Sequence, residues 1–219
     1  MEIRRTANAG VLLKLDGISV LLDGVCREVK PYLATPLEER ERLLQSCSDV
    51  VAFSHTHEDH CDPAFAAAWQ RQTGRAILSP EGIGECRTTH KILHRGGVTI
   101  IPVESRHIGK QDPQLRHSSY ILQGSRCVWF LGDASPLQWK QKEGLPKPDV
   151  LIAPYAYAAS SAAWNETKFL GAKHVVLLHL PRRREDSYGL WEAVETSAGP
   201  DIGRNLLIPE LGQCITVDL

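Results

Sequence analysis

The chain has 219 residues, of which 42% are hydrophobic and 23% are charged, and its formal net charge is -1. A chain of this length and composition can bury a substantial core, which argues against disorder and against a coiled coil. The balanced charge gives no global attraction to nucleic acid or to an anionic membrane.

Membrane and secretion signals are also missing from the sequence. No apolar run approaches the roughly twenty residues of a membrane span, and no apolar stretch of a signal peptide follows the basic start. The six cysteines are scattered, without a Cys-x-x-Cys pair. We therefore expect reduced thiols and a cytoplasmic protein that does not bind membranes.

The first predicted element is a hairpin. Residues 11–15 and 18–22 are apolar runs joined by Asp16-Gly17, a strong two-residue turn signal. Asp23 follows the second run directly. At the end of a strand this carboxylate is either a turn residue or part of a site.

A cluster of potential metal ligands follows a buried strand predicted over residues 49–53. Its members are His55, His57, Asp59 and His60. His55 and His57 lie two positions apart in extended chain, so both imidazoles point the same way and can reach one cation. Asp59 and His60 lie beyond the strand and can turn toward a second cation. This density of nitrogen and oxygen ligands predicts a site for zinc, manganese or iron.

The rest of the chain alternates between helices and strands. Helices are predicted over residues 35–45, 62–71 and 160–170, from Ser135, and from a cap at Ser187; the first two have caps at Thr35 and Asp62. Strands are predicted over residues 76–78, 98–103, 120–122, 127–131, 149–154, 175–178, 206–208 and 214–217. This pattern predicts a layered α/β fold, with residues 1–219 forming one domain of two αβ halves.

Three further potential ligands, His107, Asp133 and His179, each come shortly after a predicted strand. His107 can complete the first site, which is otherwise short of a third protein ligand. Gly132 allows a tight turn, and Asp133 then lies where a carboxylate at a strand's end can bridge two cations.

With these residues in this order, the chain resembles the metallo-β-lactamase superfamily of metal-dependent hydrolases, over nearly its whole length. The resemblance implies a four-layer αββα sandwich with two divalent metal ions at one edge of its sheets. The ligands it implies are His55, His57 and His107 for one ion, Asp59, His60 and His179 for the other, and Asp133 as the bridge. It also implies that Asp23 orients a ligand through hydrogen bonds.

Details of the sequence separate branches of this superfamily. Enzymes that hydrolyse β-lactam antibiotics lack the aspartate found here at 133, and glyoxalase II usually has Gly-His-Thr where this chain has Arg106-His107-Ile108. Ribonuclease Z commonly adds an arm for tRNA, for which this chain has little room. The opening segment, residues 8–13, and its hairpin look most like the compact branch that includes ascorbate-6-phosphate lactonase.

The predicted chemistry is hydrolysis by a hydroxide formed between two cations, with zinc expected and manganese or iron as alternatives. The substrate would be a small ester, lactone, amide or phosphoester, and Asp59 would align the nucleophile. His117 is the candidate proton donor to the leaving group, with a surface loop role as the alternative.

Several other groups have two interpretations each. Tyr155 and Tyr157 either line the substrate pocket or pack in the core. The run 182–184 of three arginines either holds a substrate phosphate or is a solvated loop. Cys61 either modifies the site or packs.

Three other functions stay open. One is a metal-dependent nuclease or phosphodiesterase acting on RNA or DNA, against which the neutral charge and the absence of a basic arm argue. Another is iron-dependent redox chemistry, which the same superfamily hosts. The last is a non-catalytic metal-binding regulator.

Overall fold

The structure, a computed structural model, describes residues 1–109, 114–141 and 144–217, and their strands form two seven-stranded sheets. The first sheet has the order β14 (Cys214–Thr216), β1 (Glu2–Arg5), β2 (Val11–Leu15), β3 (Ile18–Leu22), β4 (Val50–Ala52), β5 (Ile77–Leu78) and β6 (Thr88–Thr89). The second has the order β13 (Leu206–Leu207), β12 (His174–Leu178), β11 (Val150–Pro154), β10 (Cys127–Phe130), β9 (Ser118–Gln123), β8 (Val98–Glu104) and β7 (Leu93–Arg95).

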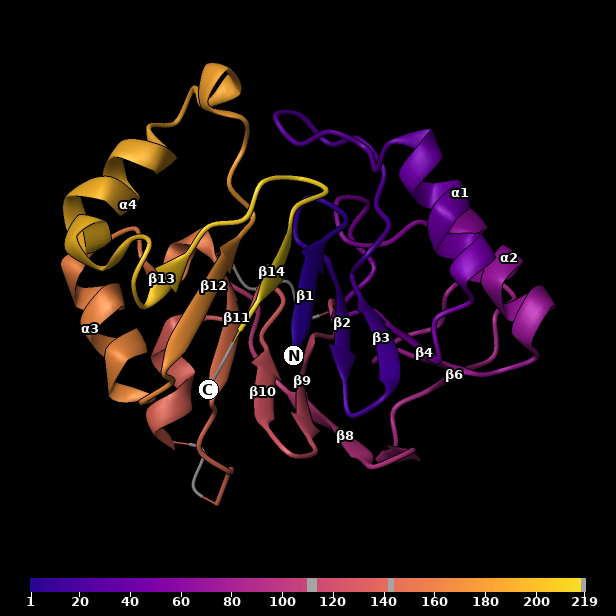
Figure 1. Cartoon of the computed structure of the whole chain (residues 1–219). Helices are drawn as coiled ribbons and strands as arrows, with labels where there is room; N and C mark the ends of the chain where they lie inside the picture. The colour runs from indigo at the N-terminus through magenta and orange to yellow at the C-terminus, as the bar shows by residue number, and fades with distance from the viewer. Residues whose placement is uncertain (110–113, 142–143, 218–219) are drawn as a thin grey trace.

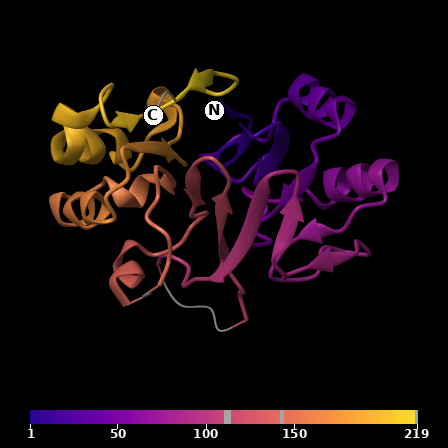
Figure 2. The same cartoon turned by 60° about the horizontal axis from the view of Figure 1, so that its bottom comes forward.

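Helices cover the outer face of each sheet, on opposite sides of the molecule (Figures 1 and 2). The helices α1 (Leu37–Ser46) and α2 (Pro63–Thr73) pack on the first sheet, and α3 (Ser161–Phe169) and α4 (Leu190–Ala198) pack on the second. There are also short 3-10 turns, named η1 (Pro136–Gln141), η2 (Tyr155–Tyr157), η3 (Arg183–Glu185) and η4 (Gly199–Asp201). The predicted four-layer αββα sandwich is therefore confirmed.

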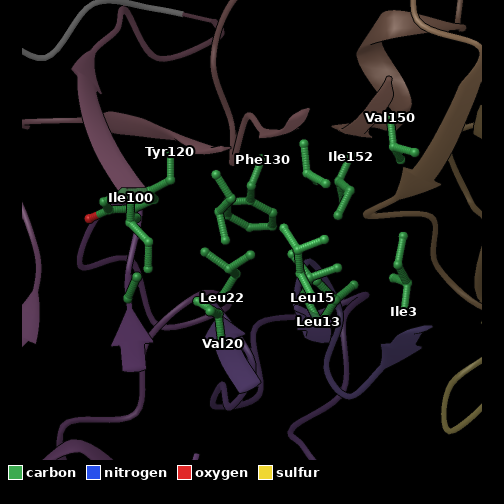
Figure 3. Packing of buried hydrophobic residues seen from close by; sticks show 14 of the residues in the cluster. Ile3, Leu13, Leu15, Val20, Leu22, Ile100, Tyr120, Phe130, Val150 and Ile152 are labelled. Atoms are coloured by element: carbon green, nitrogen blue, oxygen red, sulfur yellow. The ribbon is translucent and has the colours of Figure 1, made fainter. Parts of the chain in front are cut away.

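Alternation along the central strands explains why the sheets stack in this way. In β2, Leu13 and Leu15 lie in the core between the sheets, whereas Leu12 packs in the outer core with α1 and α2. In β10, Phe130 lies between the sheets and Trp129 packs outward, with the helices of the other side. Because successive side chains point to opposite faces, strands that are apolar at every position bury both faces of each sheet. Figure 3 shows the inner faces meeting.

The C-terminal strand returns to the N-terminal sheet, where β14 pairs antiparallel with β1. The amide of Val217 donates to the carbonyl oxygen of Met1 at 3.1 Å. The sequence analysis did not predict β1, β6 or β7, whereas the hairpin of β2 and β3 and the other strands lie close to their predicted positions.

Two of the predicted helix caps are wrong. The hydroxyl of Thr35 accepts the backbone N–H of Cys26 at 3.0 Å, and α1 begins without a side-chain cap. At α4, the carboxylate of Asp186 rather than Ser187 accepts the amides of Leu190 and Trp191, at 3.0 and 2.8 Å. The cap predicted for α2 is confirmed, because Asp62 accepts the amides of Ala64 and Phe65.

Among the described residues, no helix combines the length and the apolar character that a membrane crossing requires.

Candidate metal centre

Histidines and aspartates from both sheets meet at one end of the sandwich. Asp23 follows β3, His55 lies just after β4, Asp133 follows β10 and His179 follows β12. Two bonds join the sheets here: the amide of Ser118 donates to the carbonyl oxygen of Ser54, and the hydroxyl of Tyr120 donates to that of Phe53. The strand ends therefore bring these side chains together although the chain separates them widely.

One group of potential ligands consists of His55, His57 and His107, with one nitrogen of each within 4.8 Å of the others. The Nε2 atom of His55 lies 3.0 Å from Nδ1 of His57. The Nδ1–H of His107 donates to the carbonyl oxygen of Ile108 at 2.6 Å. In the neutral ring, Nε2 of His107 is then unprotonated and carries a lone pair. This group can hold one cation.

A second group consists of Asp59, His60 and His179. The Nε2 atom of His179 lies 3.2 Å from Oδ2 of Asp59 and 3.2 Å from Nε2 of His60. His179 has a positive φ of 64°, a conformation that side chains rarely adopt, and its amide donates to the carbonyl oxygen of Asn8. The backbone therefore turns sharply to aim this imidazole at the cluster.

Asp133 lies between the two groups. Its Oδ2 atom is 3.4 Å from Nε2 of His60, 3.5 Å from Nε2 of His179 and 3.7 Å from Nε2 of His107. Burial alone would raise the pKa of this carboxyl, but the neighbouring His179 and His60 hold it well below its usual range. The carboxylate is therefore negative and within reach of both groups.

Asp23 orients His60 directly, and His55 through Ser54, by hydrogen bonds. Its Oδ1 and Oδ2 atoms accept the backbone N–H and the hydroxyl of Ser54, each at 2.6 Å, and Oδ2 also accepts Nδ1–H of His60 at 2.8 Å. Because the Ser54 hydroxyl donates to Asp23, it accepts Nδ1–H of His55 at 2.9 Å. These bonds engage Nδ1 of both imidazoles and leave Nε2 of each directed at the cluster, the orientation that a metal ligand needs.

His117 holds the turn that carries Asp133. Its Nε2 atom accepts the backbone N–H of Asp133 at 3.0 Å, so its Nδ1–H donates to the hydroxyl of Ser105 at 2.8 Å. The Ser105 hydroxyl in turn meets Ser119, whose hydroxyl donates to the carbonyl oxygen of Leu131. Burial lowers the pKa of His117 to about 3, so the ring is neutral and both nitrogens are occupied.

The donor set fits divalent cations. The Nε2 atom of His107 and the Oδ1 atom of Asp133 are buried without a hydrogen-bond partner in the described structure, and such atoms are costly unless a cation or water meets them. Burial also lowers the pKa of His55 well below its usual value, which favours the neutral ring that coordinates metal. Imidazole and carboxylate donors suit zinc, manganese and iron alike.

Of the residues with two predicted interpretations, Tyr155 lies near the metal centre, whereas Tyr157 and Cys61 pack in the cores. Tyr155 lies beside the cluster, with its ring centroid 6.1 Å from that of His179. Tyr157 and Cys61 are buried and belong to the outer cores, and the Tyr157 hydroxyl accepts Nε1–H of Trp139 at 2.6 Å. The sequence analysis missed Tyr32, whose ring meets that of His179 edge-on at 4.4 Å. Nothing in its irregular segment signals this contact.

A four-layer αββα sandwich with two His/Asp groups at one end of its sheets is the architecture of the metallo-β-lactamase fold. The sequence model of the beta-lactamase superfamily domain matches residues 2–176. The chain therefore belongs to the beta-lactamase superfamily and is a metal-dependent hydrolase of a fold that binds divalent metals. No curated protein matches the chain in sequence.

Solved structures share this fold over the whole chain. The isothiocyanate hydrolase from Delia radicum gut bacteria is 19% identical, with 99% of each chain covered and a TM-score of 0.75. Igni18, a metallo hydrolase from the archaeon Ignicoccus hospitalis, is 20% identical, with 100% and 98% of the chains covered and a TM-score of 0.70. CmlA, a diiron beta-hydroxylase from Streptomyces venezuelae, is 14% identical, with 100% of this chain and 54% of CmlA covered and a TM-score of 0.67.

Proposed function

We propose that this protein is a zinc-dependent hydrolase of small molecules, acting on an ester, a lactone or a phosphoester. The observation that supports this most directly is the position of the Asp133 carboxylate between the two three-residue groups. A carboxylate shared by the two groups would allow each group to hold a cation at the same time. Two divalent cations held by these groups would supply Lewis acidity and a hydrolytic nucleophile at physiological pH.

The chain's own residues would then orient the reactants. Asp59 lies at the edge of the second group, where its carboxylate can accept a proton of the attacking water and aim its lone pair at the substrate. Asp23 and Ser54 hold His60 and His55 in the required tautomers. These positions are fixed by hydrogen bonds before substrate arrives, so little reorganisation accompanies the reaction.

We propose that His117 positions Asp133 and does not protonate the leaving group, because neither ring nitrogen has an N–H free for a substrate. Tyr32 and Tyr155 are better candidates. Burial and nearby negative charges raise the pKa of both phenols, so they keep their protons at neutral pH. Both rings lie beside His179.

Metal analysis with a substrate panel tests the function. Protein purified with and without oxygen should contain zinc rather than iron, and it should hydrolyse members of a panel of lactones, aryl esters, phosphodiesters and one isothiocyanate. The isothiocyanate is included because a protein of the same fold acts on that class. Iron content with oxygen-dependent turnover, or digestion of single-stranded RNA instead of the panel, would overturn the proposal.

A variant pair links activity to the cluster. His57→Ala should lower metal content and reduce kcat/KM at least a hundredfold while the fold is kept. His94→Ala is the matched control, because His94 is exposed and bonds only to Thr99 in the described structure. Full activity of His57→Ala would contradict the assignment.

A further inference from the structure

A cavity of about 550 Å³ adjoins the metal centre. Tyr32 lines it, and the same ring meets His179 edge-on at 4.4 Å, so Tyr32 lies where the cavity borders the metal centre. Leu180, the residue after His179, also lines the cavity. In Figure 1, the violet segment before α1, the orange segment after β12 and the yellow segment before β14 gather at this end of the sandwich.

The lining is largely apolar. Pro31, Leu33, Pro181, Trp191, Ile208 and Leu211 contribute carbon surface from three separate segments of the chain. The volume is in the range that holds one small molecule and is too small for a macromolecule. This part of the lining suits an apolar group.

The charged groups of the lining do not form an anion site. The guanidinium of Arg5 donates to the carbonyl oxygens of Ala7, Asn8, Leu180 and Pro209. Arg183 pairs with Glu195 at 2.7 Å and stacks on Trp191 at 4.0 Å. Arg182 shares the lining with two carboxylates, Glu185 and Glu210. This balance argues against the substrate phosphate that the arginine run suggested.

Two polar side chains of the lining, Asn8 and Glu185, each have a buried atom without a hydrogen-bond partner among the described residues, and only that of Asn8 is a donor. Asn8 is only 7% exposed, and its Nδ2 atom is buried without a hydrogen bond in the described part of the chain. Its backbone carbonyl oxygen accepts the amide of His179 at 3.2 Å, which fixes the residue beside the metal centre. Asn8 lines the cavity, and a rotation about χ2, which exchanges the two ends of the carboxamide, would turn its N–H toward a bound acceptor.

We propose that this cavity binds the uncharged apolar body of the substrate and that Asn8 donates a hydrogen bond to an oxygen of the same molecule. The substrate class is then an ester or lactone with an aryl or alkyl group, rather than a phosphoester or a polar sugar derivative. This inference rests on the proposed hydrolase function, because it takes the neighbouring centre to be the reacting site.

Ligands without a hydrolysable bond test the cavity separately from the reaction. Benzylacetone carries a carbonyl oxygen and an apolar body, whereas acetone carries the carbonyl alone. In calorimetric titrations of the metal-loaded protein, benzylacetone should bind at least tenfold more tightly than acetone. Equal affinities would overturn the proposal even if the protein is a hydrolase. Another outcome is that benzylacetone binds more tightly to a protein that hydrolyses no member of the substrate panel. That result would support the cavity and would count only against the proposed hydrolase function.

Two variants locate the binding. Ala34→Trp adds a large side chain to the cavity lining and should weaken benzylacetone binding at least tenfold. Ala162→Trp, the same substitution at an exposed position of α3 outside the lining, should leave binding unchanged. Unchanged affinity in Ala34→Trp, or equal losses in both variants, would contradict the assigned cavity.

Asn8→Ala tests the hydrogen bond. It should weaken benzylacetone binding about fivefold, the effect of one hydrogen bond, without lowering the midpoint of thermal unfolding. Stability is kept because the substitution removes a buried donor that the folded protein leaves unpaired. A lower midpoint with unchanged binding would show that Asn8 is structural and would refute its role.

Discussion

The Nε2 atom of His117 accepts the backbone N–H of Asp133 at 3.0 Å. Through Ser105 and Ser119, the same imidazole is connected to the carbonyl oxygen of Leu131, two residues before Asp133. The ring therefore closes a hydrogen-bonded loop around the turn that places the carboxylate between the two ligand groups. His117, which precedes β9, thus fixes the position of Asp133, which follows β10.

His117→Phe should lower kcat at least tenfold and reduce the metal content, because Asp133 loses the acceptor that holds its turn. His117→Gln, which keeps an acceptor, should recover part of both. The pH profile of kcat should keep its shape in both variants. Loss of the basic limb of that profile with normal metal content would instead indicate that His117 transfers the proton.

Asp23→Asn should weaken metal binding about 10- to 100-fold, because the amide presents a donor where His60 and Ser54 both need an acceptor. Competition with a chelator of known affinity measures the change. Asp16→Asn is the control, since it removes the same charge at the exposed turn between β2 and β3. Equal metal affinity in Asp23→Asn would show that the imidazole orientation does not depend on this carboxylate.

Gly132→Ala should lower the free energy of unfolding by about 2–4 kcal/mol, from left-handed strain and overpacking. Gly132 has a φ of 54°, and an added Cβ would lie 2.5 Å from the Ser54 hydroxyl and 2.9 Å from Nε2 of His117. Gly82→Ala serves as control, because nothing lies within 4 Å of its added Cβ. Similar urea denaturation midpoints for the two variants would contradict this account.

The sequence predicts the ligand residues well because their local pattern is strong. A fully apolar strand followed by four ligands in six positions restricts both the backbone and the chemistry, and the structure brings His107, Asp133 and His179 to the same place. What the pattern could not supply is the role of His117. Its two partners, a serine hydroxyl and a backbone amide, are defined only once β8, β9 and β10 are assembled.

The missed features have a common cause in long-range contacts. The pairing of β1 with β14 joins segments more than 200 residues apart, and of these two strands only β14 was predicted. Tyr32 lies in an irregular segment, and its contact with His179 spans most of the sequence. The error at Thr35 has a local cause: the hydroxyl accepts the amide N–H of Cys26, nine residues earlier, and so does not cap α1.

Glu39→Gln should lower the free energy of unfolding by about 1 kcal/mol at pH 7, the upper end for a partly exposed ion pair. The Glu39 carboxylate bonds to Arg42 at 2.5 Å and to Arg4 at 3.0 Å, which joins α1 to β1. Burial would raise the pKa of Glu39, but the bonds from Arg42 and Arg4 outweigh it and hold the pKa below its usual value.

A carboxyl whose pKa is depressed by folding stabilises the protein above its unfolded pKa, about 4.3 for glutamate, and loses that contribution as the pH falls through the folded pKa. The difference between wild type and Glu39→Gln should therefore be full at pH 7 and should shrink below about pH 4. Urea denaturation at several pH values measures it, with Glu38→Gln as the exposed neighbouring control. A difference that stays constant down to pH 3 would show that the substitution acts through packing and not through the ion pair.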